Sequence, residues 1–375
     1  MLQARDYFPL GLAEKSAFCN RTQETELLKN NIQSGKHTLI IASRRYGKSS
    51  LALHALKLSH IPFSEIDFYM AHDEKNIEQY LLGGIADLIG KALGPIEKLT
   101  TSIKKYVKNL KPKIELDAGP LKLELTTEQT SDPATNIKEA LLMLEQLLAE
   151  HKKHAVLLLD EFQIVGVIAE GKGIEAAIRH VAQKTRYLTI IFSGSQRRLL
   201  QTMFEDKTRP LYKLCWKLAL KRIDKEHYQK HINKAAKINW KQNLDDASFI
   251  AIMQFTERHP YYVNKLCDRI FTEYTNTAPS VKQIEKIWQA ILAEEKSDAV
   301  REISNLSMGQ KNLLRYIAIN GGNQLTSKQA MLQLQMTSSS IISALNGLED
   351  KDIIEKIDDD GYQIINPVVA FYAGK

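Results

Sequence analysis

The chain has 375 residues, of which 44% are hydrophobic and 25% are charged, as is usual for folded globular proteins. This length and composition exclude both a single small module and a wholly disordered chain. The 51 basic and 44 acidic residues give a net charge of +7, which permits an acidic partner such as nucleic acid without requiring one.

Three widely spaced cysteines, Cys19, Cys215 and Cys267, form no CxxC pair, so neither a disulfide framework nor a zinc cluster is indicated. The first residues lack an apolar run behind a basic start, and no stretch of about 18 apolar residues occurs. We therefore expect a cytoplasmic protein with no membrane-spanning segment.

Strand-like runs alternate with helical patterns between residues 37 and 193. The expected strands are 37–43, 62–70, 154–160 and 187–193, and the expected helices are 49–58, 136–153 and 173–184. Such alternation predicts an α/β fold with a mainly parallel sheet. An insertion at 71–135 is helical in its first half and then predicts a β-hairpin around Ala118-Gly119-Pro120, to which we assign no chemistry.

Beyond the last of these strands, residues 220–300 have a helical pattern. The C-terminal part then predicts three helices, at 309–322, 326–335 and 337–354, followed by a hairpin at 355–365. Three helices and a hairpin in this order predict a winged helix-turn-helix.

The segment from Ala42 to Ser49, ASRRYGKS, fits the phosphate-loop pattern GxxxxGK(S/T), except that Ala42 replaces the first glycine. Between a strand and a helix, such a loop directs backbone N–H groups and the positive helix end at a polyphosphate. Lys48 would then reach the β- and γ-phosphates, Ser49 would bind Mg²⁺, and Gly47 would let the backbone approach the phosphates. The alternative interpretation is a polar surface turn.

A second element, HAVLLLDEFQ at 154–163, is an apolar strand that ends in two acids and has the form of a Walker B motif. Asp160 would hold the Mg²⁺ sphere, and Glu161 would accept a proton from the attacking water. Desolvating two carboxylates for packing alone is unfavourable, so the pair favours nucleotide binding. Ser193 and Ser195, after the next strand, would contact the γ-phosphate or the water, or lie in a solvated turn.

Taken together, these residues resemble the archaeal-type ATPase family, a STAND-related branch of AAA+ P-loop NTPases that also occurs in bacteria. The resemblance covers nearly the whole chain. Its segments are FCNRTQETEL at 18–27, SRRYGKSSL at 43–51, LLLDEFQ at 157–163, FSGS at 192–195, RPLY at 209–212 and RHPYY at 258–262. Asn20 and Arg258 stand where the family usually has glycine.

The resemblance implies three domains: a P-loop α/β core at 1–218 with the insertion 71–135, a helical lid at 219–300, and a winged helix at 301–375. ATP or ADP with Mg²⁺ would lie between the core and the lid. Arg21 would lie near the base, Pro260 against adenine, and Arg209 would sense the γ-phosphate; His259 would touch the β-phosphate or pack between helices. The other implied nucleotide-binding residues are Ser43, Arg44, Arg45, Tyr46 and Ser50.

Positive charge is concentrated at residues 197–241, which contain 13 basic and four acidic residues. By contrast, residues 301–375 contain seven basic and eight acidic residues, among them Asp358, Asp359 and Asp360. DNA binding requires several cations at the phosphates, so we expect the winged helix to pack on its own core or on a protein partner. The basic segment is either a solvated helical face carrying Lys213, Lys217 and Lys221, or a surface that follows DNA phosphates.

We therefore expect an ATP-binding, ATP-hydrolysing switch that couples nucleotide state to the orientation of the lid and winged helix and to partner binding. One alternative is a DNA-handling ATPase resembling replication initiators or transposition helpers, and another is a nucleotide sensor that does not hydrolyse ATP. An arginine that acts in trans would require an oligomer, with Arg197, Arg198 and Arg209 as equal candidates.

Overall fold

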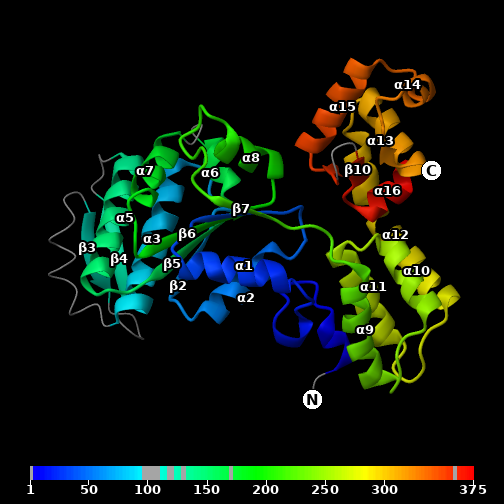
Figure 1. Cartoon of the computed structure of the whole chain (residues 1–375), viewed down its shortest axis with the longest axis horizontal. Helices are drawn as coiled ribbons and strands as arrows, with labels where there is room; N and C mark the ends of the chain where they lie inside the picture. Colours follow the sequence, from blue (N-terminus) through cyan, green and yellow to red (C-terminus); the bar gives the residue numbers. More distant parts are fainter. Residues whose placement is uncertain (1–2, 95–109, 116–121, 128–131, 169–171, 358–360) are drawn as a thin grey trace. The chain divides into compact units, whose positions relative to one another are not determined.

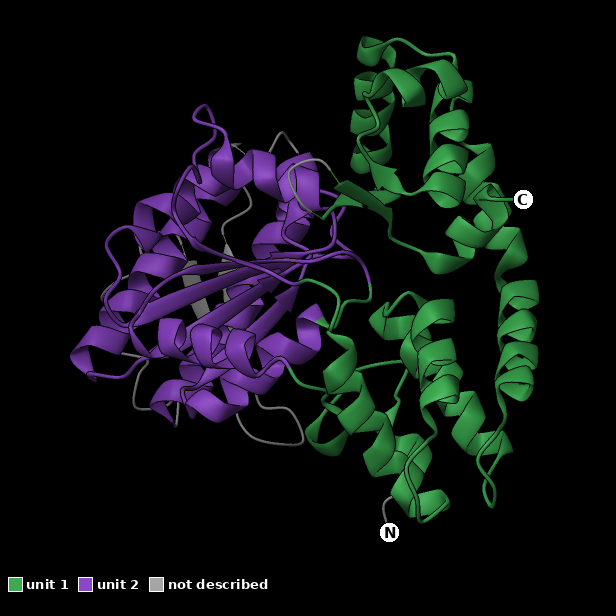
Figure 2. Ribbon diagram, turned by 45° about the vertical axis from the view of Figure 1, so that its right-hand side comes forward, with its two compact units in different colours: residues 1–20, 45–47, 221–375 green, residues 21–44, 48–220 purple. Residues whose placement is uncertain are grey.

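Two compact units make up the described chain, which in this computed structural model comprises residues 3–94, 110–115, 122–127, 132–168, 172–357 and 361–375. The α/β unit contains residues 21–44 and 48–220, and the helical unit contains residues 1–20, 45–47 and 221–375 (Figure 2). The phosphate loop is thus divided, because its residues 45–47 belong to the helical unit. The predicted division into three domains stays a prediction.

A five-stranded parallel sheet forms the centre of the α/β unit. Its order is β2 (Phe63–Asp67), β5 (Ala155–Asp160), β6 (Leu188–Gly194), β1 (Thr38–Ile41) and β7 (Trp216–Ala219). Strands β1, β5 and β6 are buried along their whole length, as expected for parallel strands covered on both faces. The predicted parallel α/β fold is confirmed.

Helices cover both faces of this sheet (Figure 1). They are α1 (Thr22–Gln33), α2 (Lys48–Ser59), α3 (Glu74–Leu93), α5 (Pro133–Glu150), α6 (Gln163–Val167), α7 (Lys172–Ala182) and α8 (Arg197–Glu205). On one face, α3, α5 and α7 share an apolar core with alternate strand residues such as Leu39, Leu157 and Ile190. Because neighbouring strand residues point to opposite faces, Ile40 and Leu158 face the other layer, which contains α1 and α2.

The insertion has the predicted order of elements. Its first half forms α3, and its second half forms an antiparallel hairpin of β3 (Leu110–Glu115) and β4 (Lys122–Thr127). The predicted turn at Ala118-Gly119-Pro120 lies outside the described residues.

One of the two interpretations of the basic segment, a helical face carrying Lys213, Lys217 and Lys221, is wrong. Residues 216–219 form strand β7, which pairs with β1 in the register Thr38 to Trp216. This strand has only four residues, and only Leu218 among them is buried, so it leaves no periodic apolar pattern. Its hydrogen-bonding partner is distant in the chain, and the sequence could not reveal it.

The helical unit contains two groups of helices and two 3₁₀ turns, η1 (Ala4–Tyr7) and η2 (Lys15–Ala17). The first group is α9 (Lys225–Asn239), α10 (Asp246–Thr256), α11 (Pro260–Glu273) and α12 (Val281–Ser304); the second is α13 (Met308–Asn320), α14 (Lys328–Leu334), α15 (Ser338–Asp350) and α16 (Pro367–Ala373). Hydroxyl groups of Ser307, Ser327 and Thr337 accept backbone N–H bonds at the starts of α13, α14 and α15, which explains why these helices begin there.

A three-stranded sheet accompanies the second group, in the order β8 (Gly322–Asn323), β10 (Gly361–Ile364) and β9 (Ile354–Lys356). The three predicted C-terminal helices and the hairpin are therefore present, although Asp358–Asp360 lie outside the described residues. One apolar core runs through the whole helical unit, and the Tyr372 hydroxyl donates to the Leu292 carbonyl at 3.0 Å, joining α16 to α12. No helix in the described ranges is both long and apolar enough to cross a membrane.

Candidate functional site

Five predicted residues meet at the carboxyl edge of the parallel sheet. Lys48 begins α2, and its ammonium donates to Asp160 Oδ1 at the end of β5 and lies 3.3 Å from Glu161 Oε1. Ser49 Oγ donates to Asp160 Oδ2 at 3.1 Å. Ser193, on the neighbouring strand β6, donates to Asp160 Oδ1 at 2.5 Å. The two motifs therefore converge on one buried carboxylate.

Asp160 stays ionised in this environment. Burial raises the pKa of its carboxyl group, but the positive charge of Lys48 and the hydrogen bonds from Lys48, Ser193 and the Glu161 N–H together bring the pKa below its ordinary value. At neutral pH the site thus presents a negatively charged oxygen pair beside a hydroxyl group.

In the loop from β1 to α2, only one of the two glycine positions of the phosphate-loop pattern requires a glycine. Gly47 has φ +83°, a backbone region that residues with a Cβ rarely adopt. Within the loop, the other positive φ is at Arg45, +63°. Ala42 is buried and its φ is not positive, so the position of the missing first glycine tolerates a methyl group.

Glu161 lies in an unusual backbone conformation directly after β5. Its φ is +51°, which is costly for a residue with a Cβ. Its Oε2 accepts hydrogen bonds from Ser195 Oγ at 2.9 Å and from Gln163 Nε2 at 2.5 Å. Sequence reasoning named Ser195 but gave Gln163 no role, although Gln163 stands within the quoted motif DEFQ.

The remaining predicted residues of the α/β unit lie in other surroundings. Arg209 forms an ion pair with Glu175, whose side chain is fully buried. Arg21 precedes α1 and pairs with Glu24 at 2.9 Å. Ser43 and Ser50 are buried, whereas Arg44 is exposed. The predicted roles of these five residues in nucleotide binding stay predictions.

The predicted residues of the helical unit form a second group. The guanidinium of Arg45 lies 4.0 Å from the centre of the Tyr261 ring, and the rings of Tyr46 and His259 are 5.1 Å apart in an edge-to-face contact. His259 directly precedes α11, whose first residue is Pro260. Two loop residues, Arg45 and Tyr46, thus share an environment with the predicted lid residues.

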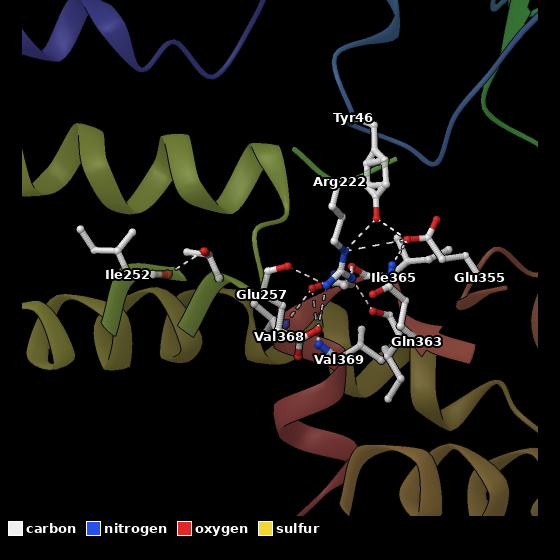
Figure 3. Close-up of polar contacts among 12 residues, drawn as sticks. Tyr46, Arg222, Ile252, Glu257, Glu355, Gln363, Ile365, Val368 and Val369 are labelled. Carbon is white, nitrogen blue, oxygen red and sulfur yellow. Dashed lines mark hydrogen bonds and ion pairs between the residues drawn. The ribbon is translucent and has the colours of Figure 1, made fainter. Parts of the chain in front are cut away.

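Tyr46 is also part of a buried polar network that sequence reasoning missed (Figure 3). Its hydroxyl donates to Glu355 Oε1 of β9 at 2.5 Å and accepts from Arg222 Nε at 3.1 Å. Arg222 also donates to the Glu257 carbonyl at 2.7 Å and to the Ile364 and Ile365 carbonyls at 2.7 and 3.0 Å. The six residues come from four distant parts of the sequence, so no local sequence pattern predicts the network.

Both motif departures, Asn20 and Arg258, occupy left-handed positions, with φ of +56° and +59°. Glycine is favoured in that region, and asparagine tolerates it better than most other residues. The backbone at both positions therefore has the conformation that a glycine would adopt.

Comparison with known proteins gives solved structures only, since no family model and no curated protein matches the chain. The Walker-type ATPase of Pyrococcus abyssi is 19% identical with a TM-score of 0.67, covering 98% of this chain and 99% of that one. The ORC2 protein of Aeropyrum pernix, in ADPNP–ADP complexes, is 14% identical with a TM-score of 0.56, covering 99% and 96%. The chain has the fold of a P-loop AAA+ ATPase.

In this AAA+ fold, the residues at the sheet edge fit a magnesium–triphosphate group. The Ser49 hydroxyl and the ionised Asp160 supply hard oxygen ligands, and Mg²⁺ commonly takes one or two protein ligands and completes its shell with phosphate oxygens and water. Lys48 supplies a cation whose present partners are carboxylates, and phosphate oxygens can replace them. The described residues contain no cluster of three His, Cys, Asp or Glu that could hold a metal by itself.

His259 gives the helical unit a predictable response to acid. Burial, followed by the charges of Arg222 and Arg45, lowers the pKa of its imidazole to about 3 from 6.5. Near pH 6.5 the unfolded chain therefore binds a proton at this imidazole that the folded chain does not bind. His259 alone should thus reduce the free energy of unfolding by about 2 kcal/mol when the pH is lowered from 7 to 5.

The measurement is urea unfolding at both pH values. The variant His259→Asn should lose about 2 kcal/mol less than the wild type between pH 7 and pH 5. A matched variant at an exposed histidine, His72→Asn, should keep the wild-type pH dependence. If His259→Asn also keeps it, His259 titrates normally and this account is wrong.

Proposed function

We propose that the protein binds ATP and ADP with Mg²⁺, hydrolyses ATP, and acts as a nucleotide-dependent switch of the archaeal-type, STAND-related ATPase family, with its C-terminal segment 301–375 as a winged helix. The observation that carries this proposal is the single hydrogen-bonded cluster of Lys48, Ser49, Asp160 and Glu161 at the carboxyl edge of a parallel sheet. Ligands of open α/β sheets bind at that edge.

The proposed chemistry assigns one task to each residue. Lys48 would leave its carboxylate partners and neutralise the β- and γ-phosphates. Ser49 and Asp160 would hold Mg²⁺, which would neutralise phosphate oxygens when bound. Water attacks the γ-phosphorus in line, its proton passes to Glu161, and the bond to the departing ADP oxygen breaks with its electron pair. Arg209 and Ser193 are proposed to contact the γ-phosphate.

The switch is supported by the network around Tyr46. This residue directly precedes Gly47 and Lys48, and it is hydrogen-bonded to Glu355 on β9 and to Arg222, which also holds two carbonyl groups at the end of β10. A loop that moves to accept phosphates would therefore disturb the C-terminal sheet. We propose that nucleotide state alters the orientation of the lid and the winged helix in this way.

Calorimetric titration with Mg·ATP and Mg·ADP, followed by steady-state turnover, tests this function. Glu161→Gln should bind Mg·ATP with an affinity within about threefold of the wild type, and its turnover should fall by about 100-fold or more because no base accepts the proton. No heat of binding would remove the whole proposal. Binding with equal turnover in both proteins would instead indicate a sensor whose Glu161 has no catalytic part.

A DNA-handling ATPase remains the second candidate, and one surface of the α/β unit favours it. Trp216 is 60% exposed on the short strand β7, and Lys36 Nζ lies 4.8 Å from its ring centre. Aromatic rings beside cations serve as stacking platforms for single-stranded nucleic acid. Binding of labelled DNA that weakens steeply with salt, and is lost in Trp216→Ala, would favour this candidate; no binding at low salt would remove it.

The proposed output is binding of a protein partner, or of further copies of the chain, through the C-terminal segment. Side chains of Leu332 and Ile342 are exposed there, at 78% and 49%. Native mass spectrometry with ADP or with a slowly hydrolysed ATP analogue would report bound partners and oligomeric state together.

A further inference from the structure

The side chain of Gln163 holds the proposed catalytic base. Gln163 begins α6 and is 2% exposed. Its Nε2 donates to Glu161 Oε2 at 2.5 Å, and Ser195 Oγ donates to the same oxygen at 2.9 Å. The other oxygen, Oε1, faces Lys48 Nζ at 3.3 Å. Two neutral hydrogen-bond donors thus bind Oε2 of Glu161. The ammonium of Lys48, which phosphates can draw away, binds Oε1.

The orientation of the Gln163 amide follows from chemistry. An ionised carboxylate only accepts hydrogen bonds, so the amide nitrogen must face Glu161. The amide oxygen then points toward Gly194 on β6, where a Cβ would come within 1.9 Å of it. A side chain at position 194 would therefore have to displace the Gln163 amide.

That amide oxygen is buried and has no hydrogen-bond partner among the described residues. An unpaired buried acceptor costs roughly 1–3 kcal/mol, which an apolar side chain of the same size would avoid. Packing alone thus does not account for glutamine at this position. What the amide gains is the bond to Glu161.

The backbone turns sharply at Glu161, between β5 and α6, beside the hydrogen bond between Gln163 and Glu161. The left-handed conformation of Glu161, φ +51°, turns the chain sharply after β5, and the Phe162 N–H then donates to the Ser193 carbonyl at 2.9 Å. Holding a residue with a Cβ in this region costs about 1 kcal/mol or more. The turn is thereby tied to the end of β6, which also supplies Ser195.

We propose that Gln163 is a positioning residue for Glu161, and this inference rests on the proposed function. With Ser195, Gln163 holds Oε2 in place. Oε1 is then the oxygen that accepts the proton from water, and it becomes free when phosphates draw Lys48 away. Gln163 itself touches neither the nucleotide nor the water.

The test compares Gln163→Met, which keeps the length but removes the donor, with Gln183→Met at an exposed site of the same unit. Gln163→Met should lower kcat by about tenfold or more and leave the calorimetric affinity for Mg·ATP within about twofold, because Glu161 loses the donor that fixes its orientation while the residues that bind the nucleotide are unchanged. Gln163→Glu, which replaces the donor by a second carboxylate, should lower kcat at least as much. Gln183→Met should match the wild type in both measurements.

A purely structural role would lower the melting temperature and reduce the calorimetric number of Mg·ATP sites in proportion to the turnover, and that result would overturn the proposal. An unchanged kcat in folded Gln163→Met would overturn it as well. Should Gln163→Met not fold, the shorter amide of Gln163→Asn carries the test with the same expected changes. Glu161→Gln, measured in parallel, distinguishes a failure of the proposed function from a failure of this inference. Full turnover in Glu161→Gln would contradict the proposed function. An inactive Glu161→Gln together with an unaltered Gln163→Met would contradict only the role of Gln163.

Discussion

Replacing Lys48 by methionine is expected to weaken the binding of Mg·ATP by about 100-fold or more and to remove measurable turnover. The ammonium of Lys48 lies between Asp160 and Glu161, and its side chain is 9% exposed. Without this cation, a triphosphate would have to approach two carboxylates, and the electrostatic repulsion between like charges is strong in a partly buried site. Titration calorimetry and a phosphate-release assay measure the two effects.

Lys57, an exposed lysine of the same helix α2, offers the matched control. Lys57→Met should bind and turn over ATP as the wild type does. Lys48→Met should also unfold at a lower temperature, because Asp160 keeps its charge in a buried place without its main partner. Wild-type ATP affinity in a folded Lys48→Met protein would show that the triphosphate does not use this loop.

Replacing Arg222 by methionine is expected to lower the free energy of unfolding of the helical unit by about 3–5 kcal/mol. The guanidinium is 5% exposed and its partners are Glu257, Tyr46 and two backbone carbonyls. Its removal takes a hydrogen bond from each of these acceptors and deprives Glu355, 3.8 Å from Arg222 Nε, of the nearby positive charge.

Urea unfolding, monitored by tryptophan fluorescence, measures this loss of free energy in the helical unit alone. The chain has three tryptophans, and in a Trp216→Phe background the remaining two, Trp240 and Trp288, both belong to the core of the helical unit. Arg301→Met removes an arginine whose side chain is 75% exposed and should change the free energy by no more than about 0.5 kcal/mol. Equal midpoints for Arg222→Met and Arg301→Met would contradict a stabilising role of the network.

The parts of the fold that the sequence predicts correctly are those with local signals. The strand ending in Asp160 and the strand leading to Ser193 are buried on both faces, so each appears as a continuous apolar run. The phosphate loop lies between a strand and a helix as its pattern requires. Its one mismatch, Ala42, is harmless because the backbone there needs no glycine.

What the sequence could not reveal depends on residues far apart in the chain. Strand β7 exists through its pairing with β1, and its four residues carry no periodic pattern. The hydrogen bonds of Tyr46 join it to residues 176 and 309 positions away. Gln163 lies two residues from Glu161, but its contact depends on the left-handed turn between them and on the space above Gly194.

The division of the phosphate loop affects how this protein can be dissected. The backbone passes between the two units four times, after residues 20, 44, 47 and 220. A fragment that starts at residue 221 would therefore lack Tyr46, and the Glu355 carboxylate and the Arg222 guanidinium would face a hole where a phenol ring belongs. Neither unit is formed by one continuous segment of the chain. A single cut at residue 220 therefore gives a C-terminal fragment whose core lacks the Tyr46 side chain.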